Sequence, residues 1–135
     1  MLLNFKTIVG HRPGPHLLIT AGVHGDEWEP MVAVQELARQ VRPDELSGRV
    51  TLVPIVNEPA YRLGKRVGED GIDLARICPG RSDGSPTERI AFELAELMRD
   101  ANYYIDLHTG GLRQPVGKEL PGVWLNDDAP FGKSG

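Results

Sequence analysis

The sequence is organised around Gly22–Pro30, GVHGDEWEP, which follows an apolar run and precedes a helical pattern. This stretch is typical of a metal-binding turn. An imidazole and a carboxylate three residues apart, His24 and Glu27, converge on one cation where the chain turns. Gly22 and Gly25 are expected to supply the backbone freedom for the turn, since glycine reaches positive φ without a Cβ penalty. Zinc takes such nitrogen and oxygen ligands, and catalytic sites combine three protein ligands with one open position.

A third ligand is therefore needed, and His108 is the candidate. It follows a β-favouring run at Tyr103–Leu107 and precedes Thr109-Gly110-Gly111. Functional side chains of an α/β sheet are presented at strand ends. Taken alone, a His-x-x-Glu pattern is weak, and an acidic first turn of a helix, which the helix dipole favours, explains it better than a metal site does. The histidine at the strand end is what strengthens the metal interpretation.

The segments around the turn alternate between strand and helix patterns. Leu2–Val9 has the apolar content of a strand, and His11–Pro15 is expected to turn the chain back. His16–Ala21 is expected to be a buried strand, and residues 29–41 place their apolar side chains at helical spacing. His11 and His16, at the two ends of this predicted turn, are interpreted as loop or strand-entry residues rather than as metal ligands.

The rest of the chain continues the alternation. A polar loop at Pro43–Gly48 precedes Val50–Val56, which is apolar and β-branched, as a strand buried on both faces would be. Asn57–Arg81 has no sustained period and is predicted to be irregular. Ser85-Pro86-Thr87-Glu88 has a capping-box pattern with proline at the first helical position, so a helix is predicted from there to about Arg99.

These elements predict one α/β domain in a three-layer αβα arrangement, with a mixed, largely parallel sheet and helices on both faces. Gly122–Leu125 is expected to add a short strand. The site is expected at the carboxyl ends of the strands. A half-sheet exposes an edge strand that must be covered or paired. This predicts either a homo-oligomer or a missing C-terminal portion.

Composition excludes several partners. The formal net charge is -4, and no cluster of basic and aromatic residues indicates nucleic-acid binding. No apolar stretch approaches the roughly 18–20 residues needed to cross a membrane. The N-terminus lacks a signal-peptide pattern, and the lone Cys78 fits a reducing compartment. A cytoplasmic location is expected.

Four blocks of the sequence together resemble the succinylglutamate desuccinylase/aspartoacylase branch of the zinc carboxypeptidase superfamily. They occur in the family's order with similar spacing, which is more specific than any single block. The blocks are Ala21–Glu27, Val53–Ala60, Asp73–Arg76 with Pro79-Gly80 just after, and Tyr104–Thr109. The resemblance implies a zinc-carboxypeptidase-like (phosphorylase/hydrolase-like) fold. Residues 1–135 would form the N-terminal part of its catalytic domain.

The resemblance also implies an activity. Zn²⁺ held by His24, Glu27 and His108 would activate water to cleave the amide bond of an N-acyl amino acid. Arg66 stands close to the place of the family arginine that polarises the scissile carbonyl, and Arg62 is its competitor.

Further roles follow from the same blocks. Arg76 matches the arginine that grips the substrate's carboxylate, which a guanidinium holds through two parallel hydrogen bonds. Asn57 is assigned to substrate binding with it. Asp73 matches an aspartate that supports a zinc-bound histidine, and it is assigned to His24. Asp106 shares a strand face with His108, and both a supporting role and a local hydrogen bond are open for it.

Three departures from the family pattern bear on function. Ala75 stands where the family usually has asparagine, which leaves the substrate class open. Cys78 stands where an aromatic is common, and it is expected to be a small buried thiol rather than a nucleophile. Members of the family are more than twice as long, and their general base, a glutamate, lies beyond the His-Thr block. No residue of this chain matches it, so the chain is expected to be truncated, to be a fragment, or to form one part of a site that another chain completes.

Two other functions compete with the hydrolase. A metal-binding but catalytically inactive domain with a structural role would explain Ala75 and the unmatched base. A plain α/β binding module without metal is the third interpretation. Metal content separates the third from the others, and turnover separates the first two.

Overall fold

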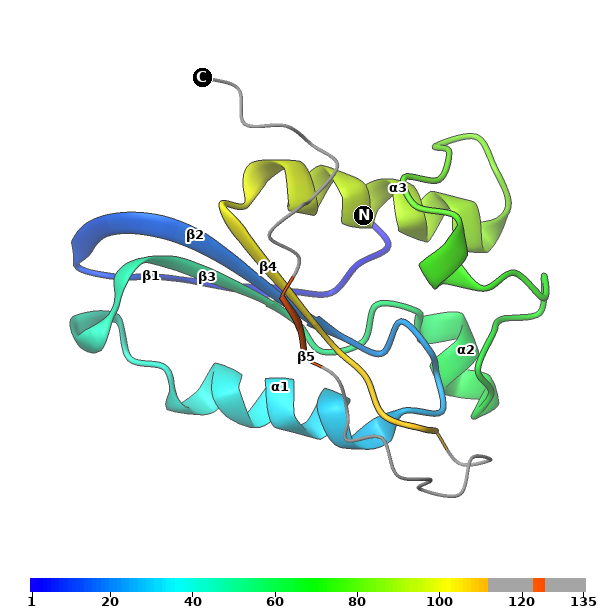
Figure 1. The fold of residues 1–135 in the computed structure, drawn as a ribbon, viewed down its shortest axis with the longest axis horizontal. Helices are drawn as coiled ribbons and strands as arrows, with labels where there is room; N and C mark the ends of the chain where they lie inside the picture. The colour runs from blue at the N-terminus through cyan, green and yellow to red at the C-terminus, as the bar shows by residue number, and fades with distance from the viewer. Residues whose placement is uncertain (112–122, 126–135) are drawn as a thin grey trace.

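The computed structural model describes residues 1–111 and 123–125 of the chain (Figure 1). The elements in chain order are β1 (Lys6–Val9), β2 (Arg12–Ala21), α1 (Trp28–Gln40), a 3₁₀ turn (Pro43–Glu45), β3 (Ser47–Val53), α2 (Glu58–Leu63), a second 3₁₀ turn (Leu74–Arg76), α3 (Pro86–Asp100), β4 (Tyr103–Leu107) and β5 (Val123–Leu125). Within the described ranges, no helix has the length and apolar character needed to span a bilayer.

The strands in the described part of the chain join one sheet in the order β1-β3-β2-β4-β5. β2 is parallel to both β3 and β4, whereas β1 and β5 are antiparallel strands at the edges. The predicted mixed, largely parallel sheet is confirmed. Parallel neighbours need a crossover connection. Here α1 makes the crossover from β2 to its neighbour β3, and the segment containing α3 carries the chain from β3 past β2 to β4, on the other side of β2.

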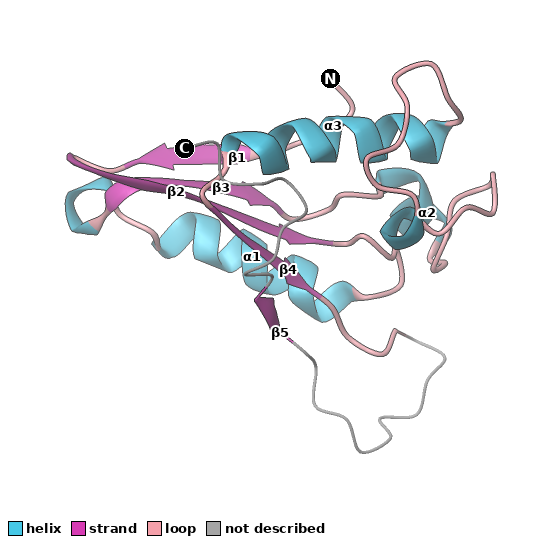
Figure 2. Ribbon diagram, turned by 45° about the horizontal axis from the view of Figure 1, so that its top comes forward, coloured by secondary structure: helices cyan, strands magenta, loops and turns pink. Residues whose placement is uncertain are grey.

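The two long helices lie on opposite faces of the sheet, as predicted (Figure 2). β2 shows why both faces need cover, because successive side chains of a strand point to opposite sides. Leu18 is fully buried and belongs to the apolar cluster that contains Ile90 of α3. Its neighbour Ile19 belongs to the cluster that contains Val34 of α1.

α3 begins where the capping pattern predicts. Ser85 Oγ accepts from the Glu88 backbone N–H at 3.3 Å, and Glu88 Oε2 accepts from the Ser85 N–H at 2.8 Å. These reciprocal bonds satisfy two backbone donors that the first helical turn leaves without partners.

The predicted turn at His11–Pro15 is wrong in its extent. β2 already begins at Arg12 and takes in both prolines, with a register shift against β3 between Arg12 and His16. Proline has no N–H for the ladder and is tolerated at such irregularities. The reversal itself lies at Gly10–His11, where the Gly10 N–H donates to Gly48 O at 2.8 Å.

The segment predicted to be irregular contains a short helix, α2. Asn57 Oδ1 accepts from the Ala60 N–H at 3.2 Å and caps its start. Gly64 ends it with φ of 60°, in the left-handed conformation that glycine adopts most readily. The predicted last strand is present as β5, and Gly122 lies outside the described residues.

Candidate metal centre

The predicted metal-binding turn, Gly22–Pro30 (the metal turn), begins at the carboxyl end of β2, as expected. After Ala21 the chain leaves the sheet, and the backbone N–H groups of Val56 and Asn57 donate to the carbonyls of Ala21 and Gly22 at 2.9 and 2.8 Å. These bonds fix the turn to the segment after β3. Gly22 has φ of 70°, so its expected conformational freedom is used.

Gly25 is required for a different reason from the one expected. Its φ is not in the left-handed region, but a Cβ at this position would lie 2.1 Å from the Ala60 carbonyl carbon and 2.2 Å from the Tyr61 nitrogen. The metal turn therefore packs directly on the backbone of α2. The Gly25 N–H also donates to Arg66 O at 3.3 Å.

His24, Glu27 and His108 converge at one point. Glu27 Oε1 lies 2.9 Å from His24 Nδ1, and Glu27 Oε2 lies 2.9 Å from His108 Nδ1. One ligand atom from each residue lies within 4.8 Å of the others, and the two imidazole centroids are 5.1 Å apart. His24 and Glu27 are buried. Two imidazole nitrogens and a carboxylate facing one point fit the ligand preference of zinc.

In both His24 and His108, the ring nitrogen that faces away from Glu27 forms a hydrogen bond with a carboxylate. Asp73 Oδ1 lies 3.1 Å from His24 Nε2, which is the pairing expected from the sequence. Asp106 Oδ2 lies 2.6 Å from His108 Nε2. A carboxylate that accepts from the outer nitrogen fixes the tautomer and the ring orientation of a metal-binding histidine. The structure therefore selects the supporting contact for Asp106, which the sequence left open.

The Thr109 backbone was not predicted to contribute, yet its N–H donates to Glu27 Oε2 at 3.1 Å. Burial opposes ionisation of Glu27, but hydrogen bonds from His108, His24 and this N–H outweigh it and lower the pKa of Glu27 to about 2. Hydrogen bonds to Asp106 and Glu27 raise the pKa of His108 to about 10, against a smaller opposing effect of burial. In the metal-free centre Glu27 is thus an anion between imidazole donors.

We expect the metal-free protein to lose stability when the pH rises from 6.5 to 10. His108 has an ordinary pKa of 6.5 and a folded pKa of about 10, so its contribution is complete below the first value and is lost through the second. The Glu27 contribution is present above pH 4.5 and is lost as the pH falls toward 2. Urea unfolding in a chelator tests this, and His108→Gln should flatten the alkaline loss. An equally steep loss in that variant would contradict the assignment.

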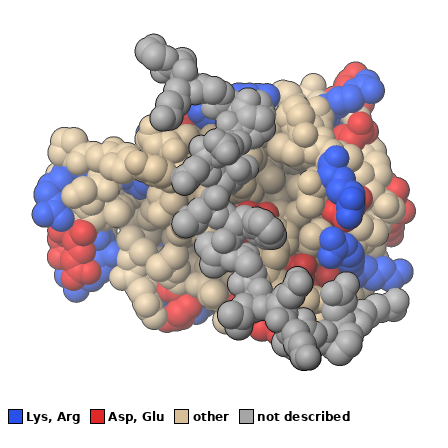
Figure 3. Space-filling view, viewed as in Figure 1, with Lys and Arg blue, Asp and Glu red and all other residues tan. Residues whose placement is uncertain are grey.

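Two arginines, Arg66 and Arg76, contact Asp73, the carboxylate behind His24. Arg66 Nη2 lies 3.2 Å from Asp73 Oδ2, and its Nη1 lies 3.9 Å from Glu27 Oε1. Arg76 Nε lies 3.5 Å from the same Asp73 oxygen and is 80% exposed. Arg62 instead pairs with Glu58, whose Oε1 accepts from Arg62 Nε at 3.0 Å. Figure 3 shows side chains of both charges close together at the end of the molecule that carries α2.

Two other residues singled out in the sequence, Asn57 and Cys78, lie in different surroundings from those expected. Asn57 is fully buried and caps α2, which leaves it no exposed surface for a substrate. Cys78 was expected to be buried, but it is exposed. Neighbouring protein atoms shield its sulfur from part of the solvent and raise the pKa of the thiol, which does not favour a nucleophilic thiolate. Ala75 is exposed beside Arg76.

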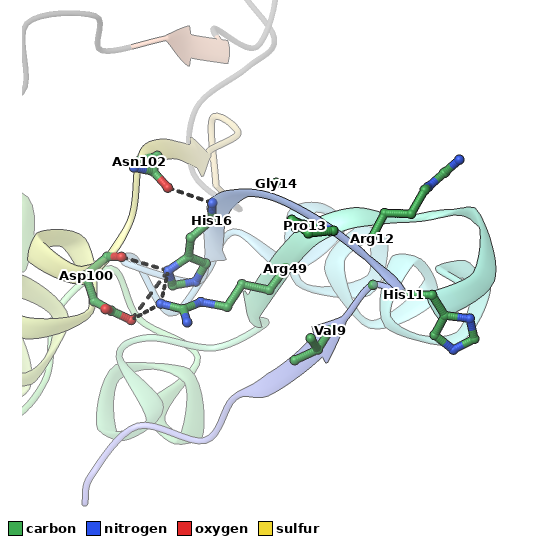
Figure 4. A pocket seen from close by; sticks show the side chains of 11 residues that line it. Val9, His11, Arg12, Pro13, Gly14, His16, Arg49, Asp100 and Asn102 are labelled. Carbon is green, nitrogen blue, oxygen red and sulfur yellow. Dashed lines mark hydrogen bonds and ion pairs between the residues drawn. The ribbon is translucent and has the colours of Figure 1, made fainter.

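A pocket of about 550 Å³ lies at the other end of β2, lined by the start of that strand and by the end of α3 (Figure 4). The buried His16 ring is held there, with Nδ1 2.9 Å from Asp100 O. Arg49 Nη2 donates to Asp100 Oδ2 at 2.8 Å. His11 is exposed, and in Figure 4 it points away from this cluster. Neither histidine joins the metal centre.

Comparison with known proteins gives one consistent result. The family model for the succinylglutamate desuccinylase/aspartoacylase catalytic domain matches residues 13–114. N-alpha-acetyl-L-2,4-diaminobutyric acid deacetylase of Halomonas elongata is 42% identical over 107 residues, which cover 78% of this chain and 31% of that protein. Succinylglutamate desuccinylase of Burkholderia thailandensis is 33% identical over 122 residues, which cover 80% and 34%.

A solved structure agrees with these relatives. The crystal structure of a succinylglutamate desuccinylase/aspartoacylase from Rhodobacter sphaeroides superposes with a TM-score of 0.76 at 37% identity, over 81% of this chain and 33% of that one. The chain thus spans about a third of the length of the relatives that it matches.

Proposed function

Because the chain belongs to the succinylglutamate desuccinylase/aspartoacylase catalytic-domain family, we propose that it carries the metal centre of a zinc-dependent hydrolase that cleaves the amide bond of an N-acyl amino acid. The observation that carries the proposal is the convergence of His24, Glu27 and His108 on one point. Amide hydrolysis fits the names of the two relatives, a deacetylase and a desuccinylase. The substrate is a small molecule.

Zinc bound by these three residues would supply a Lewis acid that lowers the pKa of a coordinated water from about 15.7 toward about 7. The protein's own part is to hold the ligands in place. Asp73 and Asp106 keep each imidazole oriented, with the outer nitrogen donating to a carboxylate. The Thr109 N–H holds Glu27 on the side of His108.

In this proposal Arg66 stabilises the negative charge that develops on the carbonyl oxygen of the scissile amide. Its guanidinium contacts Asp73 and lies near Glu27, so it is aimed at the centre while half of the side chain remains exposed. A fixed cation beside a developing oxyanion stabilises the transition state more than the ground state.

In this proposal Arg76 binds the substrate's carboxylate. One edge of its guanidinium is near Asp73 Oδ2, and most of the side chain is open to solvent. A planar guanidinium holds a carboxylate through two parallel hydrogen bonds. Ala75 offers no polar side chain next to it, so carboxylate binding would rest on the arginine itself.

The activity test measures release of the free amino acid from N-succinylglutamate and from N-acetyl-2,4-diaminobutyrate by the zinc-loaded chain. We expect Arg66→Lys to lower kcat by roughly 10²–10³-fold with unchanged zinc content, which is the range for removal of one transition-state donor. Lysine keeps the charge but loses the planar set of donors.

Arg62→Lys is the matched control, because Arg62 lies on α2 and pairs with Glu58. It should leave kcat unchanged. An Arg66→Lys variant as active as the wild type would refute the role of Arg66. Zinc binding without any turnover by the wild type would favour the alternative, a metal-binding domain that is catalytically inactive or incomplete.

A further inference from the structure

A chain of polar side chains runs through the sheet to the metal centre. Tyr104, Asp106 and His108 alternate along β4 and its continuation, so they share one face by the period of two. Thr20 of β2 is the register partner of Asp106 in the parallel ladder. Its side chain therefore stands beside that of Asp106.

The hydrogen bonds of this chain have a fixed direction. Thr20 Oγ1 donates to Asp106 Oδ1 at 2.6 Å and lies 3.0 Å from the Tyr104 hydroxyl. Threonine has one hydroxyl proton, and an ionised carboxylate only accepts. Because that proton goes to Asp106, the Tyr104 hydroxyl must donate to Thr20. Asp106 Oδ2 is left to accept from Nε2–H of His108.

We propose that Thr20 and Tyr104 are positioning residues of the metal centre: through Asp106 they hold the Nε2 proton of His108 in place and so aim its Nδ1 at the cation. The inference rests on the proposed zinc centre and adds two residues that touch neither metal nor substrate. Thr20 is fully buried, so water does not replace its hydroxyl as a donor to Asp106. Tyr104 in turn keeps the Thr20 hydroxyl pointed at the carboxylate.

A purely structural role for Thr20 predicts lower stability and unchanged metal binding, so metal affinity is the discriminating measurement. Thr51 of β3 provides the matched control. It is also buried, and its Oγ1 makes two side-chain contacts, at 2.9 Å to Thr7 Oγ1 and at 2.8 Å to His16 Nε2. These contacts are made to β1 and to the first half of β2, and they do not include any residue of the metal centre.

The experiment measures the zinc dissociation constant by chelator competition for the wild type, Thr20→Val, Thr20→Ser and Thr51→Val. We expect valine at position 20 to weaken zinc binding about 10–100-fold, the range for loss of partners behind metal ligands. Serine should restore wild-type affinity because it keeps the hydroxyl. Thr51→Val should bind zinc like the wild type, although urea unfolds it earlier.

Tyr104→Phe is the second test, since it removes only the outermost donor. It should weaken zinc binding by less than Thr20→Val does. In the Co²⁺-loaded chain, Tyr104→Phe and Thr20→Val should shift the visible absorption in the same direction. Wild-type affinity in both Thr20→Val and Tyr104→Phe would overturn the inference and leave the zinc centre standing. Equal weakening in Thr51→Val would also overturn it. A wild type that binds no zinc would overturn the proposed function together with the inference.

Discussion

Alanine at His24 or at His108 should abolish stoichiometric zinc binding. Each imidazole supplies one of three ligand atoms that face one point, and each contacts a different carboxylate oxygen of Glu27. Loss of a residue behind a ligand already weakens metal affinity by about 10–100-fold. Loss of the ligand itself should therefore weaken zinc binding by more than about 100-fold, which is enough to leave the purified variants without metal.

Elemental analysis of the purified chain checks this, with about one zinc per chain expected for the wild type. His11→Ala is the matched control, because His11 is an exposed histidine at the far end of β2. It should keep the full zinc content. Zinc retained in both His24→Ala and His108→Ala would place the metal elsewhere, and a wild type without metal would support the plain α/β module.

Gly25→Ala should lower the free energy of unfolding more than Gly22→Ala, the other glycine-to-alanine change in the metal turn. Its Cβ would lie 2.1 Å from the Ala60 carbonyl carbon, and backbone atoms cannot rotate away as a side chain does. The turn and α2 would have to separate. Overpacking of this kind costs about 3 kcal/mol. The separation would also displace Arg66, whose carbonyl accepts from the Gly25 N–H.

Gly68→Ala is the matched control for this change. A Cβ at Gly68 meets its nearest neighbour at 3.7 Å, an ordinary contact, and its φ is outside the left-handed region. Its free energy of unfolding should change by less than about 1 kcal/mol, since alanine also restricts the unfolded chain. Urea unfolding of both variants provides the measurement. A Gly25→Ala variant as stable as Gly68→Ala would show that α2 is free to move away from the turn.

Local pattern was sufficient for the long elements. The helical spacing after the metal turn predicts α1, and the capping box at Ser85 predicts the start of α3. Both signals depend on neighbours within four residues. The pattern failed at Pro13 and Pro15, where pairing with β3 extends β2 through residues that ordinarily break a strand. It also failed at α2, a helix too short to show a period.

The candidate ligands were identifiable from residue type and spacing, and the structure brings them together. Their binding of zinc stays a prediction. Asn57 shows the opposite case, because its place in a matching block indicated substrate binding while its side chain is buried as a helix cap. Residue type does not reveal which way a side chain faces when the surrounding segment has no regular period.

The sequence by itself determined the α/β class, the long elements and the three residues that converge at the carboxyl ends of β2 and β4. These depend on periodicity and on the chemistry of individual side chains. Only the tertiary structure decided that Asp106 supports His108, that Thr20 and Tyr104 stand behind it, and that Gly25 packs on α2. Thr20 and Asp106 are 86 residues apart in the chain. Only the parallel pairing of β2 with β4 makes them neighbours.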